Sequence, residues 1–99
     1  MIVVRDIFHV EPDQMKQAKE LLKKQREIGQ RLGHTILRVL TDLTGEYYTL
    51  ILESEFKSLA DYEVALHKVL ADPEFQQHYP KFRSLIRGGR REIFTVVVE

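Results

Sequence analysis

The sequence predicts a small α+β domain with the element order β-α-β-β-α-β. Two segments rich in β-branched and aromatic residues, 2–10 and 91–98, lie near the two ends of the chain. Two amphipathic helical regions lie between them, and two further strand-like segments, 34–41 and 46–56, separate those regions. Ninety-nine residues suit one hydrophobic core, so we expect residues 1–99 to form a single domain.

The first helix is predicted between Pro12 and Gly33. Proline suits the first helical position because its missing N–H has no helical partner there, and glycine is a common C-terminal stop. Apolar residues recur between them at helical spacing: Met15, Ala18, Leu21, Leu22, Ile28 and Leu32. A turn at Thr44-Gly45 then joins the second and third predicted strands in a hairpin.

The second helical region begins at Ser58, which can cap the helix, with Asp61 placed favourably in its first turn. Asp72-Pro73 interrupts the apolar stripe and starts a second helical piece. Inside that piece Pro80 predicts a kink or a restart. Gly88-Gly89 predicts a turn before the last strand.

Composition excludes several classes of protein. Fifteen Lys and Arg balance fifteen Asp and Glu, so no net charge attracts nucleic acid or anionic lipid. Cysteine is absent, which excludes disulfides, thiolate catalysis and cysteine zinc sites. No signal peptide is visible, and no apolar run approaches the roughly 20 residues that span a bilayer. We therefore expect a cytoplasmic protein that does not contact membranes.

Right-handed crossovers predict a four-stranded antiparallel sheet with both helices on one face and the first strand beside the third. We call the other side the free face. Its predicted members are Val3, Arg5, Ile7 and His9 from the first strand, Tyr47, Thr49, Ile51, Glu53 and Glu55 from the third, and Ile93, Thr95 and Val97 from the last. This mixture is too apolar for open water and too polar for a sealed core. We expect a second copy to cover it, giving a homodimer whose sheets enclose a polar-lined cavity.

His9 and Arg5 are the candidate catalytic residues on the free face, and Tyr47 and Glu53 are candidate ligand-binding neighbours. A histidine near a carboxylate can act as general base or acid near neutral pH, and an arginine can hold a carboxylate or enolate oxygen. The alternative is that these residues form an ion-pair network at the dimer interface.

His67 and His78, in the second helical region, are further candidate ligand-binding residues, with an ordinary surface histidine as the alternative for each. A straight helix would place them on similar faces, although Asp72-Pro73 breaks that register. His34 is interpreted only as the start of a strand. No histidine has the spacing of a metal-binding motif, so no metal site is predicted.

RNA-recognition domains share the predicted strand order, but the third strand here carries Glu53-Ser54-Glu55, which would repel phosphate. The basic cluster at 87–91 is interpreted as a solvated turn that at best binds a small anion. Phosphate-binding loops, dinucleotide fingerprints and serine-nucleophile motifs are absent from the sequence. No nucleic acid partner is expected.

Three segments carry a resemblance to a known group: Phe8-His9-Val10-Glu11-Pro12, Glu53-Ser54-Glu55-Phe56-Lys57-Ser58, and Leu70-Ala71-Asp72-Pro73-Glu74-Phe75. With them the chain resembles the dimeric α/β-barrel superfamily, which has a ferredoxin-like βαββαβ fold and includes antibiotic-biosynthesis monooxygenase-like and NIPSNAP-like domains. Asp13 stands where that group often has glycine. The resemblance implies two facing sheets around a cavity, and many members are enzymes without a metal or bound cofactor. His67 and His78 resemble histidines near the cavity mouth of the monooxygenases. Haem-degrading members use Asn and typically Trp with a His, and this chain has no Asn or Trp.

The sequence thus predicts a homodimer that binds a small organic molecule in its inter-sheet cavity. It would act as a cofactor-independent monooxygenase or isomerase, with His9 as proton acceptor and Arg5 as anion holder. The alternative is a non-catalytic ligand-binding or assembly module of the same fold.

Overall fold

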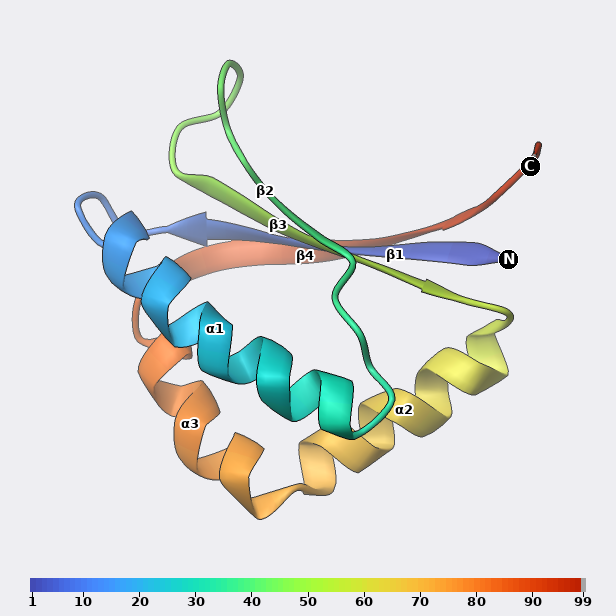
Figure 1. Cartoon of the computed structure of the whole chain (residues 1–99). Helices are drawn as coiled ribbons and strands as arrows, with labels where there is room; N and C mark the ends of the chain where they lie inside the picture. Colours follow the sequence, from blue (N-terminus) through green and yellow to red (C-terminus); the bar gives the residue numbers. More distant parts are fainter. Residues whose placement is uncertain (99) are drawn as a thin grey trace.

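A computed structural model describes residues 1–98 and contains the predicted elements in the predicted order, with the second helical region divided into two helices (Figure 1). The strands are β1 (Ile2–Val10), β2 (Arg38–Thr41), β3 (Thr49–Phe56) and β4 (Ile86–Thr95). The helices are α1 (Met15–Arg31), α2 (Leu59–Ala71) and α3 (Pro73–Arg83). The sheet order is β2-β3-β1-β4, and all neighbouring strands are antiparallel. All three helices lie on one side of this sheet, which confirms the ferredoxin-like α+β fold.

The helix boundaries have the predicted chemical causes. The Ser58 hydroxyl oxygen accepts a hydrogen bond from the backbone N–H of Asp61 (3.2 Å) at the start of α2. The Asp72 carboxylate accepts one from the N–H of Phe75 (3.0 Å), and Pro73 occupies the first turn of α3. Gly33 follows α1 with a φ of +86°, a left-handed conformation that glycine adopts without steric cost.

Two residues depart from local preference without ending an element. Pro80 lies inside α3, which continues to Arg83, so the predicted restart does not occur there. Asp13, in the turn before α1, has a φ of +69°. Aspartate is one of the few non-glycine residues that tolerates this region, which explains how it can stand at a position that suits glycine.

The main core lies between the sheet and the helices. Its largest fully buried aromatic side chain is Phe82 of α3, which meets the ring of Phe8 edge-on with centroids 5.3 Å apart. The other buried members come from both layers: Val10, Ala18, Leu22, Ile36, Leu50 and Leu52. Burial of this apolar surface is what holds α1 and α3 against the sheet.

The predicted turn at Gly88-Gly89 is wrong, because both glycines lie within β4. Gly89 pairs with Phe8 on β1, and a Cβ atom on it would meet the carbonyl oxygen of Ile7 at 2.2 Å. The glycine is needed for a close approach of two strands, rather than for a turn. The chain reverses instead through the short segment 84–85 between α3 and β4.

The predicted facing of the last strand is also wrong. Ile93 pairs with Val4, whose side chain points to the helices, whereas Phe94 pairs with Val3 on the free face. The side-chain period of a strand is two, so an error of one residue exchanges the faces for Thr95 as well. Val97 lies beyond the end of β4.

The second and third strands are shorter than predicted. Residues 34–37 form an irregular segment before β2, and β3 begins only at Thr49. Tyr48 has a φ of +60°, which ends the strand alternation, so Tyr47 lies in the connecting loop and is 76% exposed. That loop extends from the side of the sheet opposite the helices (Figure 1).

Candidate functional site

The centre of the free face holds a buried carboxylate between two arginines. Register places Glu53 on β3 directly between Arg5 on β1 and Arg38 on β2. Arg5 Nε donates to Glu53 Oε2 at 2.7 Å, and Arg38 Nε donates to Oε1 at 2.9 Å. The hydrogen bond from Arg38 lowers the pKa of Glu53, burial opposes this shift, and the bond from Arg5 adds to it. Arg5 is therefore already paired with a carboxylate of its own chain.

His9 lies on the same face but away from this group. It pairs with Thr49 and Gly88, and its nearest acidic partner is Glu46, with Nδ1 and Oε1 3.7 Å apart. At that distance no hydrogen bond forms, so within residues 1–98 the buried Nδ1 atom has no hydrogen-bond partner. Arg5 and Glu53 are brought together as predicted, whereas His9 and Tyr47 are not part of their network.

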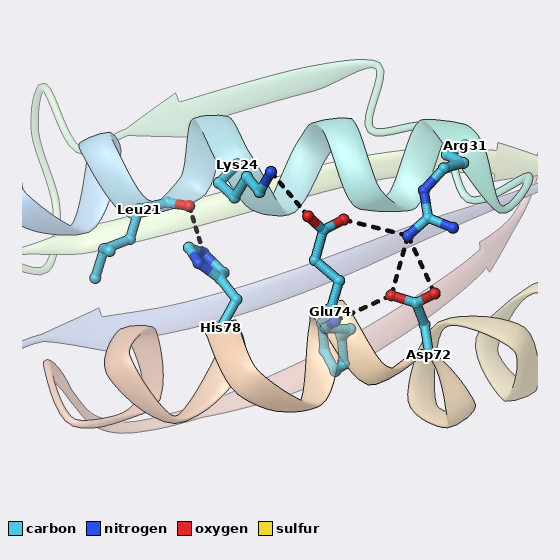
Figure 2. A network of polar contacts seen from close by, with 7 residues as sticks. Leu21, Lys24, Arg31, Asp72, Glu74 and His78 are labelled. Atoms are coloured by element: carbon cyan, nitrogen blue, oxygen red, sulfur yellow. Dashed lines mark hydrogen bonds and ion pairs between the residues drawn. The ribbon is translucent and has the colours of Figure 1, made fainter.

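The two helix histidines lie on the other side of the sheet. His67 is exposed on α2, with its Nε2 atom 3.9 Å from Glu63 one turn earlier. His78 on α3 instead donates from Nε2 to the carbonyl oxygen of Leu21 on α1 at 2.7 Å (Figure 2). The pair is not on one face of a common helix, because Asp72 starts a new helix between them.

His78 belongs to a set of polar contacts that ties α3 to α1 (Figure 2). Lys24 and Arg31 of α1 contact Glu74 at 2.9 and 3.3 Å, and Arg31 also bonds Asp72 at 3.0 Å. The hydrogen bond from Lys24 lowers the pKa of Glu74. These contacts give His78 a structural role in fixing the two helices that wall the interior.

A cavity with a volume of about 610 Å³ lies between the helices and the sheet. This is on the side of the sheet opposite the free face, where the hollow around Arg5 and Glu53 has only about 270 Å³. The apolar lining of the cavity of about 610 Å³ comes from both the helices and the sheet, and includes Phe8, Ile36, Leu52, Leu66, Val69 and Phe75. An apolar cavity with a few convergent polar groups is typical of a small-molecule site.

His34 lines this cavity and is held there by its backbone. Its N–H donates to the carbonyl oxygen of Gly29 at 2.8 Å, and a Cβ on Gly29 would lie 2.6 Å from the His34 carbonyl oxygen. The imidazole meets the rings of Phe56 and Tyr62 edge-on, with centroids 5.4 and 5.9 Å apart. Burial lowers the pKa of His34, so the ring is neutral near pH 7 and able to accept a proton.

An ion pair and two unpartnered polar atoms lie near His34; Asp6, Arg91 and Gln25 line the cavity, and Tyr62 packs behind it against His34. Arg91 of β4 bonds Asp6 of β1, and its guanidinium lies 5.7 Å from the ring centroid of Tyr62. Burial raises the pKa of Tyr62, which keeps its hydroxyl protonated. In the part of the chain that the structure describes, the buried Tyr62 hydroxyl and the buried Gln25 Oε1 have no hydrogen-bond partner. Such atoms are rare and are satisfied when a ligand or water binds.

Sequence reasoning missed this site, although one signal for it was present. Asp6 falls on the helix-facing side of the first strand, where a charged residue is unexpected between apolar neighbours, whereas Arg91 joins it only in the observed register of β4. His34 carried no comparable signal, because its position depends on the irregular segment 34–37. No three side chains of His, Asp and Glu gather as a metal site within residues 1–98, nor is any helix there long and apolar enough to cross a membrane.

Comparison with known proteins shows the family to which the chain belongs. The NIPSNAP family model matches residues 6–98. The chain belongs to the NIPSNAP family. No curated protein matches it in sequence.

Solved structures share the fold of this NIPSNAP chain at low sequence identity. A NIPSNAP family protein from Agrobacterium tumefaciens strain C58 is 19% identical, with a TM-score of 0.89 over 95% of this chain and 90% of that one. A NIPSNAP domain protein from Burkholderia xenovorans is 10% identical, with a TM-score of 0.91 over 98% and 95%. A variant of SnoaB, a cofactor-independent oxygenase from Streptomyces nogalater, is 14% identical, with a TM-score of 0.70 over 99% and 94%. These comparisons confirm the resemblance to NIPSNAP-like and monooxygenase-like domains at the level of fold.

Proposed function

We propose that this NIPSNAP protein binds a small organic molecule in the cavity between its helices and sheet. We further propose that it acts there without a cofactor, as an oxygenase or an isomerase, with His34 accepting a proton from the bound molecule. One observation carries this proposal: a partly buried histidine, neutral near pH 7, lines a cavity of about 610 Å³ beside polar atoms that have no hydrogen-bond partner within residues 1–98. The fold shared with a cofactor-independent oxygenase supports it.

Each polar group has a role that its surroundings support. His34 is the base, since burial favours its neutral form. The Tyr62 ring meets the His34 ring edge-on and helps to position it, and the Tyr62 hydroxyl stays protonated because burial raises its pKa. Arg91 is already compensated by Asp6, so this pair orients its neighbours rather than binding the substrate. Both oxygenation of an activated carbon and isomerisation of a ketone can begin with this proton removal.

Proton exchange tests the base directly, because it needs no oxidant. The probe is 2-tetralone in D2O, whose acidic C–H becomes C–D when a base removes the proton. We expect the protein to accelerate this exchange, and His34→Gln to lower the acceleration by about 10²-fold or more. His67→Gln, at an exposed histidine outside the cavity, is the matched control and should leave the rate unchanged. An unchanged rate in His34→Gln would exclude His34 as the base.

The alternative remains a non-catalytic ligand-binding module. Binding of 2-tetralone can be measured by the NMR shifts of the Leu66 and Val69 methyl groups. Binding without any accelerated proton exchange would favour that alternative over the enzyme. Native mass spectrometry of freshly purified protein would also give the mass of any natural ligand that the protein retains.

We also propose that the free face forms a homodimer, as the mixed character of this face supports. Leu40 and Phe94 are partly exposed apolar side chains on it, beside the charges of Arg5 and Glu53. An apolar patch of this kind is typical of an interaction surface.

Light scattering at micromolar concentration tests the dimer, with Phe94→Lys as the disrupting variant. Val64→Lys, at an exposed apolar residue on α2, is its control. A monomeric wild type would contradict the proposal. Arg5 and His9 stay as a second candidate site in the dimer cavity. At that second site His9→Ala should abolish binding of a co-purified ligand while leaving folding intact, whereas binding of 2-tetralone between helices and sheet should not change. Unchanged binding of the co-purified ligand would count against His9.

A further inference from the structure

Within residues 1–98, two arginines at the edge of the cavity have no hydrogen-bond or ion-pair partner for their side chains. The chain contains eight arginines, and six of them make a side-chain hydrogen bond or ion pair. Arg83 and Arg87 make none within residues 1–98, and both line the cavity between helices and sheet. We propose that they bind the carboxylate of an apolar organic acid whose body occupies this cavity. This inference rests on the proposed function and names its substrate class.

Local structure brings the two side chains to one end of the cavity. Arg83 is the last residue of α3, and Arg87 is the second residue of β4, so only the short reversal at 84–85 separates their elements. Phe82, fully buried next to Arg83, anchors the end of the helix in the core. The two guanidinium groups therefore belong to well-packed elements rather than to a loose loop.

A β-bulge aims the second arginine. Gly88 pairs with His9 and Ile86 pairs with Val10, so Arg87 is the extra residue of β4 at this irregularity. Bulges turn a side chain out of the regular alternation and occur often beside active sites. The bulge thus gives a structural reason for Arg87 to reach the cavity, which strand alternation alone does not provide.

The charges of the lining leave a positive surplus at this end. Of the other two arginines that line the cavity, Arg91 is neutralised by Asp6 and Arg90 by Glu92. No acidic residue is paired with Arg83 or Arg87 in the described part of the chain. Two like charges at one site repel each other unless an anion lies between them, and a guanidinium matches a planar carboxylate by paired N–H donors.

The rest of the cavity suits an apolar body attached to that carboxylate. Leu66, Val69 and Phe75 line it on the helix side. Phe8 and Leu52 line it on the sheet side. A carboxylate at the arginines would thus extend its apolar part towards His34, the proposed base.

A matched pair of probes tests the charge requirement: 2-naphthoate and its neutral methyl ester, with affinity measured by calorimetry on the full chain. We expect wild type to bind 2-naphthoate about ten times more tightly than the ester. Arg83→Gln and Arg87→Gln should each weaken 2-naphthoate binding about five- to tenfold and leave the ester within twofold. Lys81→Gln removes a charge from the same helix outside the cavity and should change neither affinity.

Different failures separate the two proposals. Equal binding of the two probes by wild type, or unchanged 2-naphthoate affinity in the Arg83→Gln/Arg87→Gln double variant, would overturn the carboxylate inference. The cavity proposal would survive if the Leu66 and Val69 methyl resonances still shifted with the ester. Absence of those shifts with both probes and with 2-tetralone would overturn the cavity proposal as well.

Discussion

Replacing Gly89 by alanine is expected to destabilise the sheet strongly, because a Cβ atom at this position would run into the backbone of β1. The new Cβ would lie 2.2 Å from the carbonyl oxygen of Ile7, whereas Cβ atoms in proteins essentially never come within 3.0 Å of such an atom. Neither group is a flexible side chain, so the strands themselves must separate. Overpacking of this kind costs about 1–3 kcal/mol, and the weakened ladder hydrogen bonds add about 1 kcal/mol. We expect a total loss of about 2–4 kcal/mol.

Gly88 provides the control within the same strand. A Cβ on Gly88 meets no atom within 4 Å. Gly88→Ala should therefore change the free energy of unfolding by less than about 0.5 kcal/mol, with alanine slightly favoured over glycine in a strand. Both variants differ from wild type by one methyl group, so the comparison isolates the contact with Ile7.

Urea unfolding followed by circular dichroism, at one fixed protein concentration, measures both effects. A loss of 2–4 kcal/mol should also lower Tm by roughly 10–25 °C for a chain of this length. Similar, small effects of the two substitutions would refute the close approach of the strands. Similar, large effects would indicate that both glycines occupy a turn that alanine cannot adopt.

Two further predictions concern titration. Glu53→Gln should lower the free energy of unfolding by about 1–2 kcal/mol, because it weakens the contacts with both arginines, while exposed Glu55→Gln should change little. The pKa of Glu53 is lowered on folding, so this contribution is complete above its unfolded pKa near 4.5 and disappears as pH falls through the folded pKa. If the difference in the free energy of unfolding between wild type and Glu53→Gln persisted unchanged into strong acid, this explanation would be wrong. Burial lowers the pKa of His34, so its NMR titration midpoint should lie below 6.5, and stability relative to His34→Gln should fall as pH decreases from 6.5 towards that midpoint. A midpoint at or above 6.5 would show that the ring is not desolvated.

Much of the fold was predictable from local signals. Ser58, Asp72 and Pro73 mark helix starts through hydrogen bonds within one turn, and Gly33 marks a helix end through its own φ angle. Likewise, the alternation of β1 and β3 placed Arg5 and Glu53 on one face, where they do form an ion pair.

The errors arose where a remote contact overrides a local preference. Gly88-Gly89 has the composition of a turn, but its backbone pairs with β1, more than seventy residues earlier in the chain. The predicted strand 91–98 therefore began five residues too late, and its alternation was assigned to the wrong faces because its pairing with β1 is not visible in its own sequence. Tyr47 was lost from the third strand because Tyr48 adopts a positive φ that its residue type does not predict.

The sequence by itself determined the order of strands and helices, the helix caps and the charged pair on the free face, because these depend on residues close in sequence or on simple alternation. Only the tertiary structure decided where the interior is hollow. The cavity exists because the helices pack against the sheet without filling all the space between the two layers, and because Gly29 admits the backbone of His34. Packing between distant residues makes that space, so the candidate base moved from His9 on one side of the sheet to His34 on the other.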